Sequence, residues 1–161
     1  MSVYVVFIGK VHIYMENFFD WKEQENIRNL HKFNEDHHWF TSITPTERFD
    51  HTDAVCMTAD NRKITVELKT RDAPIEQFKK WGTVLIEPQK LAHFSLIMES
   101  GFTLGETCLY INFASDGVII FDFNKLKNVQ IIPNHKHYNK GKRKCEYETR
   151  FALDMKEAII L

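Results

Sequence analysis

Two short apolar runs joined by a polar turn restrict the fold of this chain more than any other part of its sequence. The runs are DAVCMT (residues 53–58) and ITVELKT (residues 64–70), and ADNRK separates them. Both runs contain residues that favour strands, and the adjacent Asp60 and Asn61 favour a tight turn. The segment therefore predicts an antiparallel hairpin of two buried strands.

Charged side chains interrupt the second run at two positions. Because side chains alternate between the faces of a strand, Glu67 and Lys69 share one face, about 6–7 Å apart along the strand. The other face is apolar, with Ile64, Val66 and Leu68. In the hairpin, Asp53 lies at the end of the first strand that is far from the turn, and therefore near Glu67. The sequence thus predicts two carboxylates with an amine beside them.

Metal-assisted hydrolysis of phosphodiester bonds uses these groups. Carboxylates are preferred ligands of Mg²⁺ and Mn²⁺, and Mg²⁺ keeps several waters and takes substrate phosphates as further ligands. A neighbouring lysine can position or deprotonate the attacking water and stabilise charge on the phosphate oxygens. We therefore expect Mg²⁺, or Mn²⁺ in its place, as the cofactor.

The same residues resemble the signature of the PD-(D/E)XK nucleases, which are restriction-endonuclease-like phosphodiesterases. Asp53 is followed, after residues 54–66, by the triplet ELK that ends at Lys69, and Thr52 stands where the family's name has proline. The resemblance implies that Asp53 and Glu67 bind the metal and that Lys69 is the catalytic amine. It also implies a Mg²⁺-dependent nuclease that acts on DNA, with RNA left open, and it is compatible with a homodimer.

Further helices and strands are predicted on both sides of this hairpin. The spacing of apolar residues predicts a helix over residues 20–33 and a second one from Pro88 to near Gly101. The predicted strands are residues 38–44, 53–58, 64–70, 83–87, 108–113, 118–123, 129–133 and 145–153. We expect one α/β domain (residues 1–161) with a central mixed sheet flanked by helices. The resemblance covers about residues 20–113 and implies a restriction-endonuclease-like core, which leaves extra C-terminal strands.

Four further residues are candidates for accessory roles. Glu23 or Glu25 in the first helix can reach the metal, as helix acids do in some members of the family, and Glu25 is the candidate chosen. Lys90 in the second helix is a candidate for phosphate contact, and Glu87 ends the strand before it. His51 lies two residues before Asp53 and can contact the substrate. For each of the four, an ordinary surface position is the alternative.

The charge of the whole chain gives no general attraction to nucleic acid. Lys and Arg number 21, Asp and Glu number 22, and the formal net charge is −1. Affinity for DNA must therefore come from a local patch, and the stretch HKHYNKGKRK offers one. Its candidate binding residues are Lys136, Lys140, Lys142, Arg143 and Lys144. The alternative for this stretch is a solvated turn.

The cysteines and the N-terminal segment indicate the cellular compartment in which we expect the protein. Cys56, Cys108 and Cys145 are far apart and form no CxxC pair, which argues against disulfides and favours the reducing cytoplasm. The apolar run of residues 3–8 is too short for a membrane span and lacks the features of a signal peptide, so no membrane partner is expected. Met1 and Met15 both remain candidate starts.

Two alternatives to an enzyme stay open. One is a non-catalytic nucleic-acid-binding or protein-interaction module that keeps the nuclease fold. The other is a structural domain in which Glu67 and Lys69 form a solvent-exposed pair. The sequence also leaves open endonuclease versus exonuclease action and the preferred form of substrate.

Overall fold

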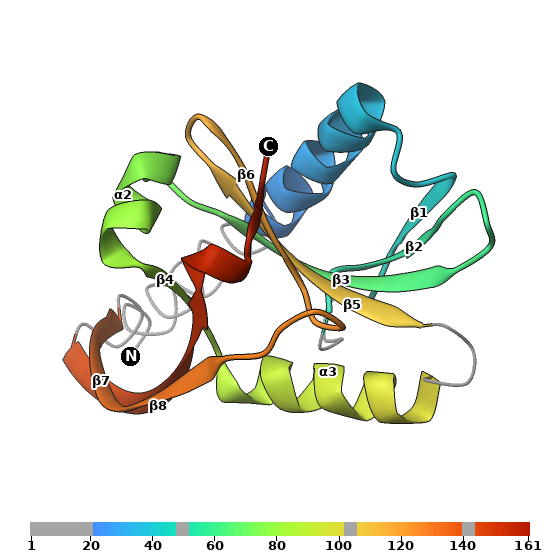
Figure 1. Ribbon diagram of the computed structural model, residues 1–161. Helices are drawn as coiled ribbons and strands as arrows, with labels where there is room; N and C mark the ends of the chain where they lie inside the picture. The colour runs from blue at the N-terminus through green and yellow to red at the C-terminus, as the bar shows by residue number, and fades with distance from the viewer. Residues whose placement is uncertain (1–20, 48–51, 102–105, 140–143) are drawn as a thin grey trace, which may run out of the picture.

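The chain folds into helices packed on a mixed β-sheet (Figure 1). The computed structural model describes residues 21–47, 52–101, 106–139 and 144–161, and residues 21–37 within them are helical. The elements that follow are β1 (Ser42–Pro45), β2 (Ala54–Met57), β3 (Lys63–Thr70), α2 (Ile75–Trp81), β4 (Thr83–Ile86), α3 (Pro88–Gly101), β5 (Thr107–Ala114), β6 (Gly117–Asp122), β7 (Val129–Asn139), β8 (Lys144–Asp154), a 3-10 helix (Met155–Glu157) and β9 (Ile159–Ile160).

Six strands form the central sheet, in the order β1-β2-β3-β5-β6-β9. The first three make an antiparallel meander, β3 and β5 run parallel, and β5, β6 and β9 are antiparallel. A second, antiparallel sheet has the order β4-β8-β7. The predicted mixed sheet with extra C-terminal strands is confirmed. The strand that carries Glu67 and Lys69, β3, lies in the interior of the central sheet.

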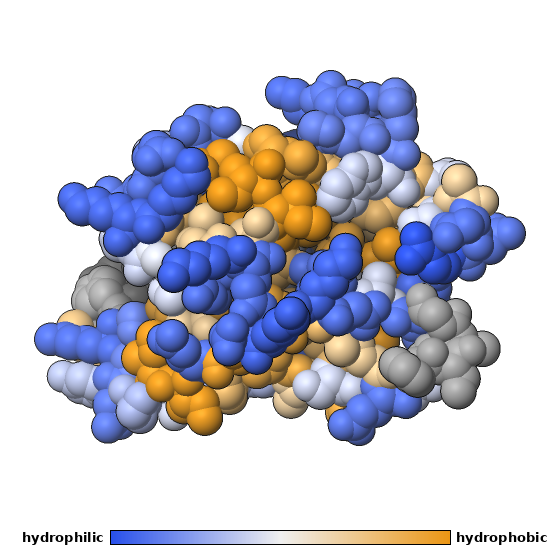
Figure 2. Space-filling model, viewed as in Figure 1, coloured by the Kyte–Doolittle hydropathy of each residue, from blue (hydrophilic) through white to orange (hydrophobic). Residues whose placement is uncertain are grey.

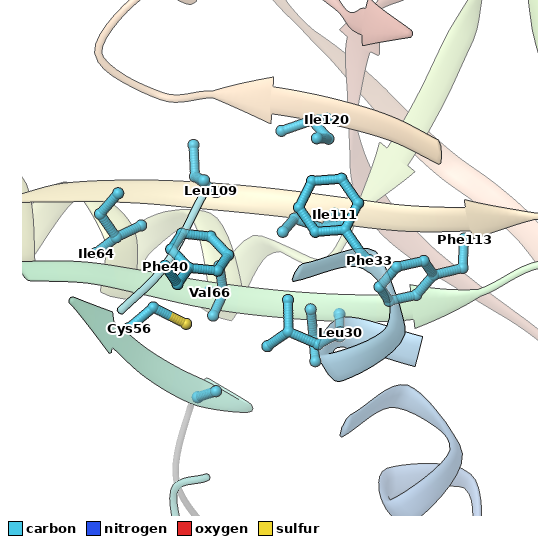
Figure 3. Packing of buried hydrophobic residues seen from close by; sticks show 12 residues of the cluster. Leu30, Phe33, Phe40, Cys56, Ile64, Val66, Leu109, Ile111, Phe113 and Ile120 are labelled. Carbon is cyan, nitrogen blue, oxygen red and sulfur yellow. The ribbon is translucent and has the colours of Figure 1, made fainter. Parts of the chain in front are cut away.

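Helices cover both faces of the central sheet. The helix of residues 21–37 packs Leu30 and Phe33 into a cluster with side chains of β3 and β5 (Figure 3). On the opposite face, Phe94 of α3 is buried in a cluster that contains residues of both sheets, among them Tyr110, Ile119, Phe121, Val84, Ile86 and Leu153. The predicted flanking helices are therefore confirmed, and β3 is covered on both of its faces.

The hairpin of β2 and β3 is closed by hydrogen bonds of Thr58. Its N–H donates to the carbonyl of Arg62 at 3.0 Å, and its Oγ1 accepts from the N–H of Arg62 at 3.0 Å. Asn61 has a positive φ of 59°, which asparagine tolerates better than most residues. This turn sets a register in which Ala54 pairs with Val66. The hairpin and its turn are as predicted.

The first strand begins later than predicted because the first helix is longer. The helix continues to residue 37, and His38 then adopts a positive φ of 55°. Asn34 bonds both backbone groups of Phe40: its Nδ2 donates to the carbonyl at 2.9 Å and its Oδ1 accepts from the N–H at 2.7 Å. Residues 38–41 therefore turn the chain, and β1 begins at Ser42.

Three further elements, α2, β9 and β7, differ from the sequence prediction for local reasons. The unpredicted helix α2 has only 7 residues, too few for a clear periodicity. The unpredicted strand β9 has only 2 residues. The strand expected to end at Pro133 continues as β7 to Asn139, with an irregular pairing between Ile132 and His135. Such an irregularity accommodates proline within a strand, so part of the basic stretch is strand and not loop.

The chain ends at one edge of the central sheet. Ile159, Ile160 and Leu161 are 36%, 38% and 42% exposed, and Figure 2 shows hydrophobic surface where the chain ends in Figure 1. This edge is therefore an apolar part of the described surface. Among the helices that the structure describes, none is long and apolar enough to cross a membrane.

Candidate functional site

Glu67 is a buried acid at the centre of the sheet. Its side chain is 0% exposed, and β2 and β5 flank its strand on either side. The alternative in which Glu67 and Lys69 form a solvent-exposed pair is therefore wrong. Alternation along β3 does place Glu67 on a different face from Leu68, but α3 and the second sheet cover that face.

Two lysines hold the Glu67 carboxylate. The Nζ of Lys69, two residues further along β3, lies 3.0 Å from Oε1. The Nζ of Lys90, in the first turn of α3, donates a hydrogen bond to Oε2 at 2.8 Å. The Lys69 contact is an ion pair that joins its ammonium to Oε1. Glu67 thus lies between two cations, with one lysine at each carboxylate oxygen.

Asp53 joins this group from the residue just before β2. Its N–H donates to the carbonyl of Val66 at 3.0 Å, and its Oδ2 accepts from the N–H of Leu68 at 2.6 Å. The two partners, Val66 and Leu68, are the sequence neighbours of Glu67. The bonds therefore hold Asp53 against β3 beside Glu67. The hairpin register therefore brings together the three residues that the sequence singled out.

Burial dominates the electrostatics of the two acids. It raises the pKa of Asp53, and a backbone hydrogen bond and the charges of Lys69 and Lys90 offset only part of this effect. Burial also raises the pKa of Glu67, where the charge of Asp53 adds to it and the lysines oppose it. For Lys69, burial lowers the pKa, but the charges of Glu67 and Glu87 outweigh it and the pKa is raised. Lys69 is therefore an ammonium at neutral pH.

The first helix contributes polar groups at the end of β3. Asn26 donates to the carbonyl of Leu68 at 3.3 Å and accepts from the Oγ1 of Thr70 at 2.9 Å. One turn earlier, the charge of Glu23 raises the pKa of Asp53. Glu25, the helix acid expected from the sequence, pairs instead with Lys22 at 3.0 Å. The sequence offered Glu23 or Glu25 and favoured Glu25, whereas the acid that acts on Asp53 is Glu23, which lies three residues before Asn26 on the same helix face.

Glu87 and Arg150 extend the charged group toward the second sheet. Oε1 of Glu87 lies 3.0 Å from Nη1 of Arg150 on β8. Burial raises the pKa of Glu87, but the charges of Lys69 and Arg150 and a backbone hydrogen bond together lower it. Glu87 was a predicted accessory residue, whereas Arg150 was not, since nothing in the sequence places β8 beside β4.

The remaining predicted residues lie apart from this group or outside the described residues. Lys136 is exposed on β7, and Lys144 is the first residue of β8. His51, Lys140, Lys142 and Arg143 lie outside the described residues. Their roles stay predictions.

The carboxylates fit Mg²⁺ better than a metal that needs a full set of protein ligands. In the part of the chain that the structure describes, no group of three or more His, Cys, Asp or Glu could hold a metal ion. Mg²⁺ is commonly bound through only a few carboxylates, with waters and phosphates as its other ligands. The buried Oε1 of Glu67 is an oxygen ligand of the kind that Mg²⁺ prefers, and Lys69 is its partner in this structure.

The similarity of this chain to known proteins lies among solved structures. No protein-family model matches the chain. No curated protein sequence matches it either. Among solved structures, the chain is similar to Hjc, a Holliday junction resolvase from Archaeoglobus fulgidus. The similarity has 12% sequence identity, a TM-score of 0.42, and covers 72% of this chain and 77% of that chain.

Proposed function

We propose that this chain is a metal-dependent nuclease that hydrolyses phosphodiester bonds in DNA. The observation that carries the proposal is the complete burial of Glu67 on an interior strand, with Asp53 and Lys69 beside it. Burying a charge costs free energy, and acids with raised pKa values concentrate at functional sites. A single domain of the PD-(D/E)XK type over residues 1–161 accounts for this arrangement.

Asp53 and Glu67 are the residues that would hold Mg²⁺ or Mn²⁺. When bound there, the cation supplies Lewis-acid stabilisation of charge on the phosphate oxygens. It also offsets the burial and the mutual repulsion that raise the pKa of both acids. To bind it, Glu67 has to exchange at least part of its contact with Lys69 and Lys90 for the metal.

Lys69 acts in this proposal as a cation and not as a base. Its raised pKa keeps the side chain protonated at neutral pH. An ammonium can donate a hydrogen bond to the attacking water and stabilise charge that develops on the phosphate. Of the two roles open to a lysine here, positioning is therefore favoured over deprotonation. Lys90 orients Glu67 through its hydrogen bond.

The basic stretch supplies affinity for the DNA backbone in this proposal. Lys136 is exposed on β7 and Lys144 is the first residue of β8, and the other proposed contacts are Lys140, Lys142 and Arg143. Contacts of this kind depend strongly on salt. RNA is the alternative substrate, and the proposal is compatible with a homodimer.

A cleavage assay tests the function. The parent protein is incubated with single-stranded, double-stranded and branched DNA, with Mg²⁺, Mn²⁺ or EDTA. We expect cleavage of at least one form with either metal, none with EDTA, and none by Glu67→Gln. Glu106→Gln is the matched control, because Glu106 contacts Lys63 at the other end of β3. Metal-independent cleavage, or full activity of Glu67→Gln, contradicts the proposal.

One observation favours a second candidate, a nucleic-acid-binding module without catalysis. Lys69 and Lys90 both form ion pairs with Glu67, so its carboxylate has cationic partners without a metal. In that case the parent protein binds DNA with a steep salt dependence and cleaves none of the three forms. Binding and cleavage measured on the same preparation decide between the two candidates.

A further inference from the structure

Two buried polar side chains on β5 lie next to the proposed site. In the parallel register of β3 and β5, Tyr110 lies beside Glu67 and Asn112 lies beside Lys69. Both side chains of β5 are 0% exposed. Paired residues of neighbouring strands share a face, so these hydrogen-bonding groups belong to the same face of the sheet as the charged group.

The guanidinium of Arg71, directly after β3, lies against both of them. Its Nε donates to Oδ1 of Asn112 at 3.2 Å, and its Nη2 donates to the hydroxyl of Tyr110 at 2.9 Å. The hydroxyl in turn donates to the carbonyl of Leu85 at 3.2 Å. Because two of its nitrogens are held, the plane of the guanidinium is fixed before any ligand binds.

The positive charge of Arg71 is not neutralised by these partners. The Asn112 amide is uncharged, and burial raises the pKa of Tyr110 to about 12, which keeps the hydroxyl neutral. Among the residues that the structure describes, no carboxylate forms an ion pair with Arg71; its side-chain bonds go to Tyr110 and Asn112. The guanidinium therefore has both charge and N–H donors available for an anion.

Asn112 adds a second donor that has no acceptor. The Nε of Arg71 can only donate, so the amide oxygen of Asn112 must face it. This leaves Nδ2, which is buried and has no hydrogen-bond partner. Buried donors are rarely left unpaired in native proteins, and each one calls for a ligand or an ordered water. A fixed cation and an unpaired donor thus lie side by side.

We propose that Arg71 and Asn112 bind a phosphate group of the nucleic acid backbone, next to the phosphate at which Lys69 acts. This inference rests on the proposed nuclease function and adds a binding residue to it. The planar guanidinium matches two oxygens of one phosphate. A group that is already held loses little freedom when the ligand binds. Arg71 contacts the substrate but not the reacting atoms.

Binding without cleavage tests the phosphate site directly. The affinity of a fluorescent single-stranded oligonucleotide is measured by anisotropy in EDTA, where the proposed nuclease is inactive. Arg71→Met should weaken binding by about 10- to 100-fold, the range for a lost hydrogen bond to a charged group. Arg62→Met is the matched control, because Arg62 is an exposed turn residue paired with Asp60. It should keep the parent affinity.

Two further variants keep the test decisive if Arg71→Met folds poorly. Asn112→Asp retains an oxygen that accepts from the Arg71 Nε, but it removes the Nδ2 donor. Its carboxylate also neutralises the charge of the guanidinium. This variant should therefore lose affinity as Arg71→Met does. Arg71→Lys keeps the charge without the planar donor pair and should lie between the parent and Arg71→Met. Inorganic phosphate should raise the melting temperature of the parent but not that of Asn112→Asp.

Cleavage then separates this inference from the proposed function. If the parent cleaves DNA with Mg²⁺, Arg71→Met should raise KM more than it lowers kcat. If the parent binds the oligonucleotide through Arg71 but never cleaves, the phosphate site stands and the nuclease proposal fails. If Arg71→Met and Asn112→Asp bind as tightly as the parent, or the parent itself does not bind, the phosphate site is wrong.

Discussion

Lys90 of α3 donates a hydrogen bond at 2.8 Å to Glu67 of β3, a residue with no exposed surface. The bond joins a helix to the interior strand on which the proposed chemistry depends. Burial raises the pKa of Glu67, and the charge of Lys90, like the larger effect of Lys69, opposes this rise. The same bond has to loosen when Glu67 binds a cation. The predictions below follow from this competition and from the residues around it.

Replacing Lys69 should remove catalysis and leave DNA binding largely intact. Lys69→Met eliminates the cation that positions water, while Asp53 and Glu67 remain. Groups in such roles typically contribute about 10²- to 10⁴-fold to the rate, so kcat should fall by at least that range. Single-turnover cleavage measures it. Lys63→Met, an exposed lysine of the same strand, is the control, and an unchanged rate in Lys69→Met excludes the assigned role.

A divalent cation should stabilise the folded protein through the two acids. A cation that binds only the native state adds about 2.7 kcal/mol to the free energy of unfolding when its free concentration is about 100 Kd. Titration of Mg²⁺ or Mn²⁺ should therefore raise the melting temperature of the parent. The shift should disappear in the Asp53→Asn, Glu67→Gln double variant. A shift that persists there means that the ion binds elsewhere.

Removing Lys90 should have opposite effects with and without metal. Without metal, Lys90→Met leaves Oε2 of the buried Glu67 without its hydrogen bond, which should cost about 1–3 kcal/mol of unfolding free energy. With Mg²⁺ present, less competition for Glu67 should give a larger stabilisation by the metal than in the parent. Denaturant titrations with EDTA and with Mg²⁺ measure both effects. Equal metal stabilisation in the two proteins would show that Lys90 does not compete.

The raised pKa of Asp53 predicts that Asp53→Asn is more stable than the parent at high pH. A carboxyl whose folded pKa lies above its unfolded value destabilises the protein as pH rises through the folded pKa, and it has no effect below the unfolded value. Asparagine carries no charge at either pH. In EDTA, the variant should gain about 0.5–2 kcal/mol at pH 8, and the gain should vanish near pH 3. An equal gain in stability at pH 8 and near pH 3 contradicts a charge effect.

The sequence predicted the hairpin and the closeness of Asp53, Glu67 and Lys69 because these features are local. Alternation along a strand fixes which residues share a face, and the Asp60 and Asn61 turn fixes the register. Neither rule depends on the rest of the chain. The same holds for α3, whose proline start and apolar stripe lie within one segment.

The burial of Glu67 was not predictable from that segment. Alternation separates Glu67 from Leu68, but it does not say what covers each face. The face of Glu67 is covered by α3 and the second sheet, whose Phe94 and Leu153 lie far along the chain and cluster with Tyr110, the partner of Glu67 on β5. The partnership of Glu87 with Arg150 has the same origin. Long-range packing therefore decided between a surface pair and a candidate active site.

Which acid of the first helix, Glu23 or Glu25, faces β3 depends on how that helix is rotated about its axis. Both acids lie in one turn, and only the contacts of Asn26 with Leu68 and Thr70 fix which side faces β3. An asparagine can be satisfied by solvent as well as by a strand end, so its sequence position alone carries little information. Contact with the end of β3 was needed to favour Glu23.

The turn closed by Thr58 and Arg62 has a consequence for how this protein can change over evolutionary time. Surface loops usually accept insertions and deletions with little effect. Here, one residue more or fewer would slide β2 along β3, move Asp53 away from Glu67 and exchange the two sides of β2. Selection for the site should therefore restrict the length of this exposed turn more strongly than its residue types, in lineages that retain the activity.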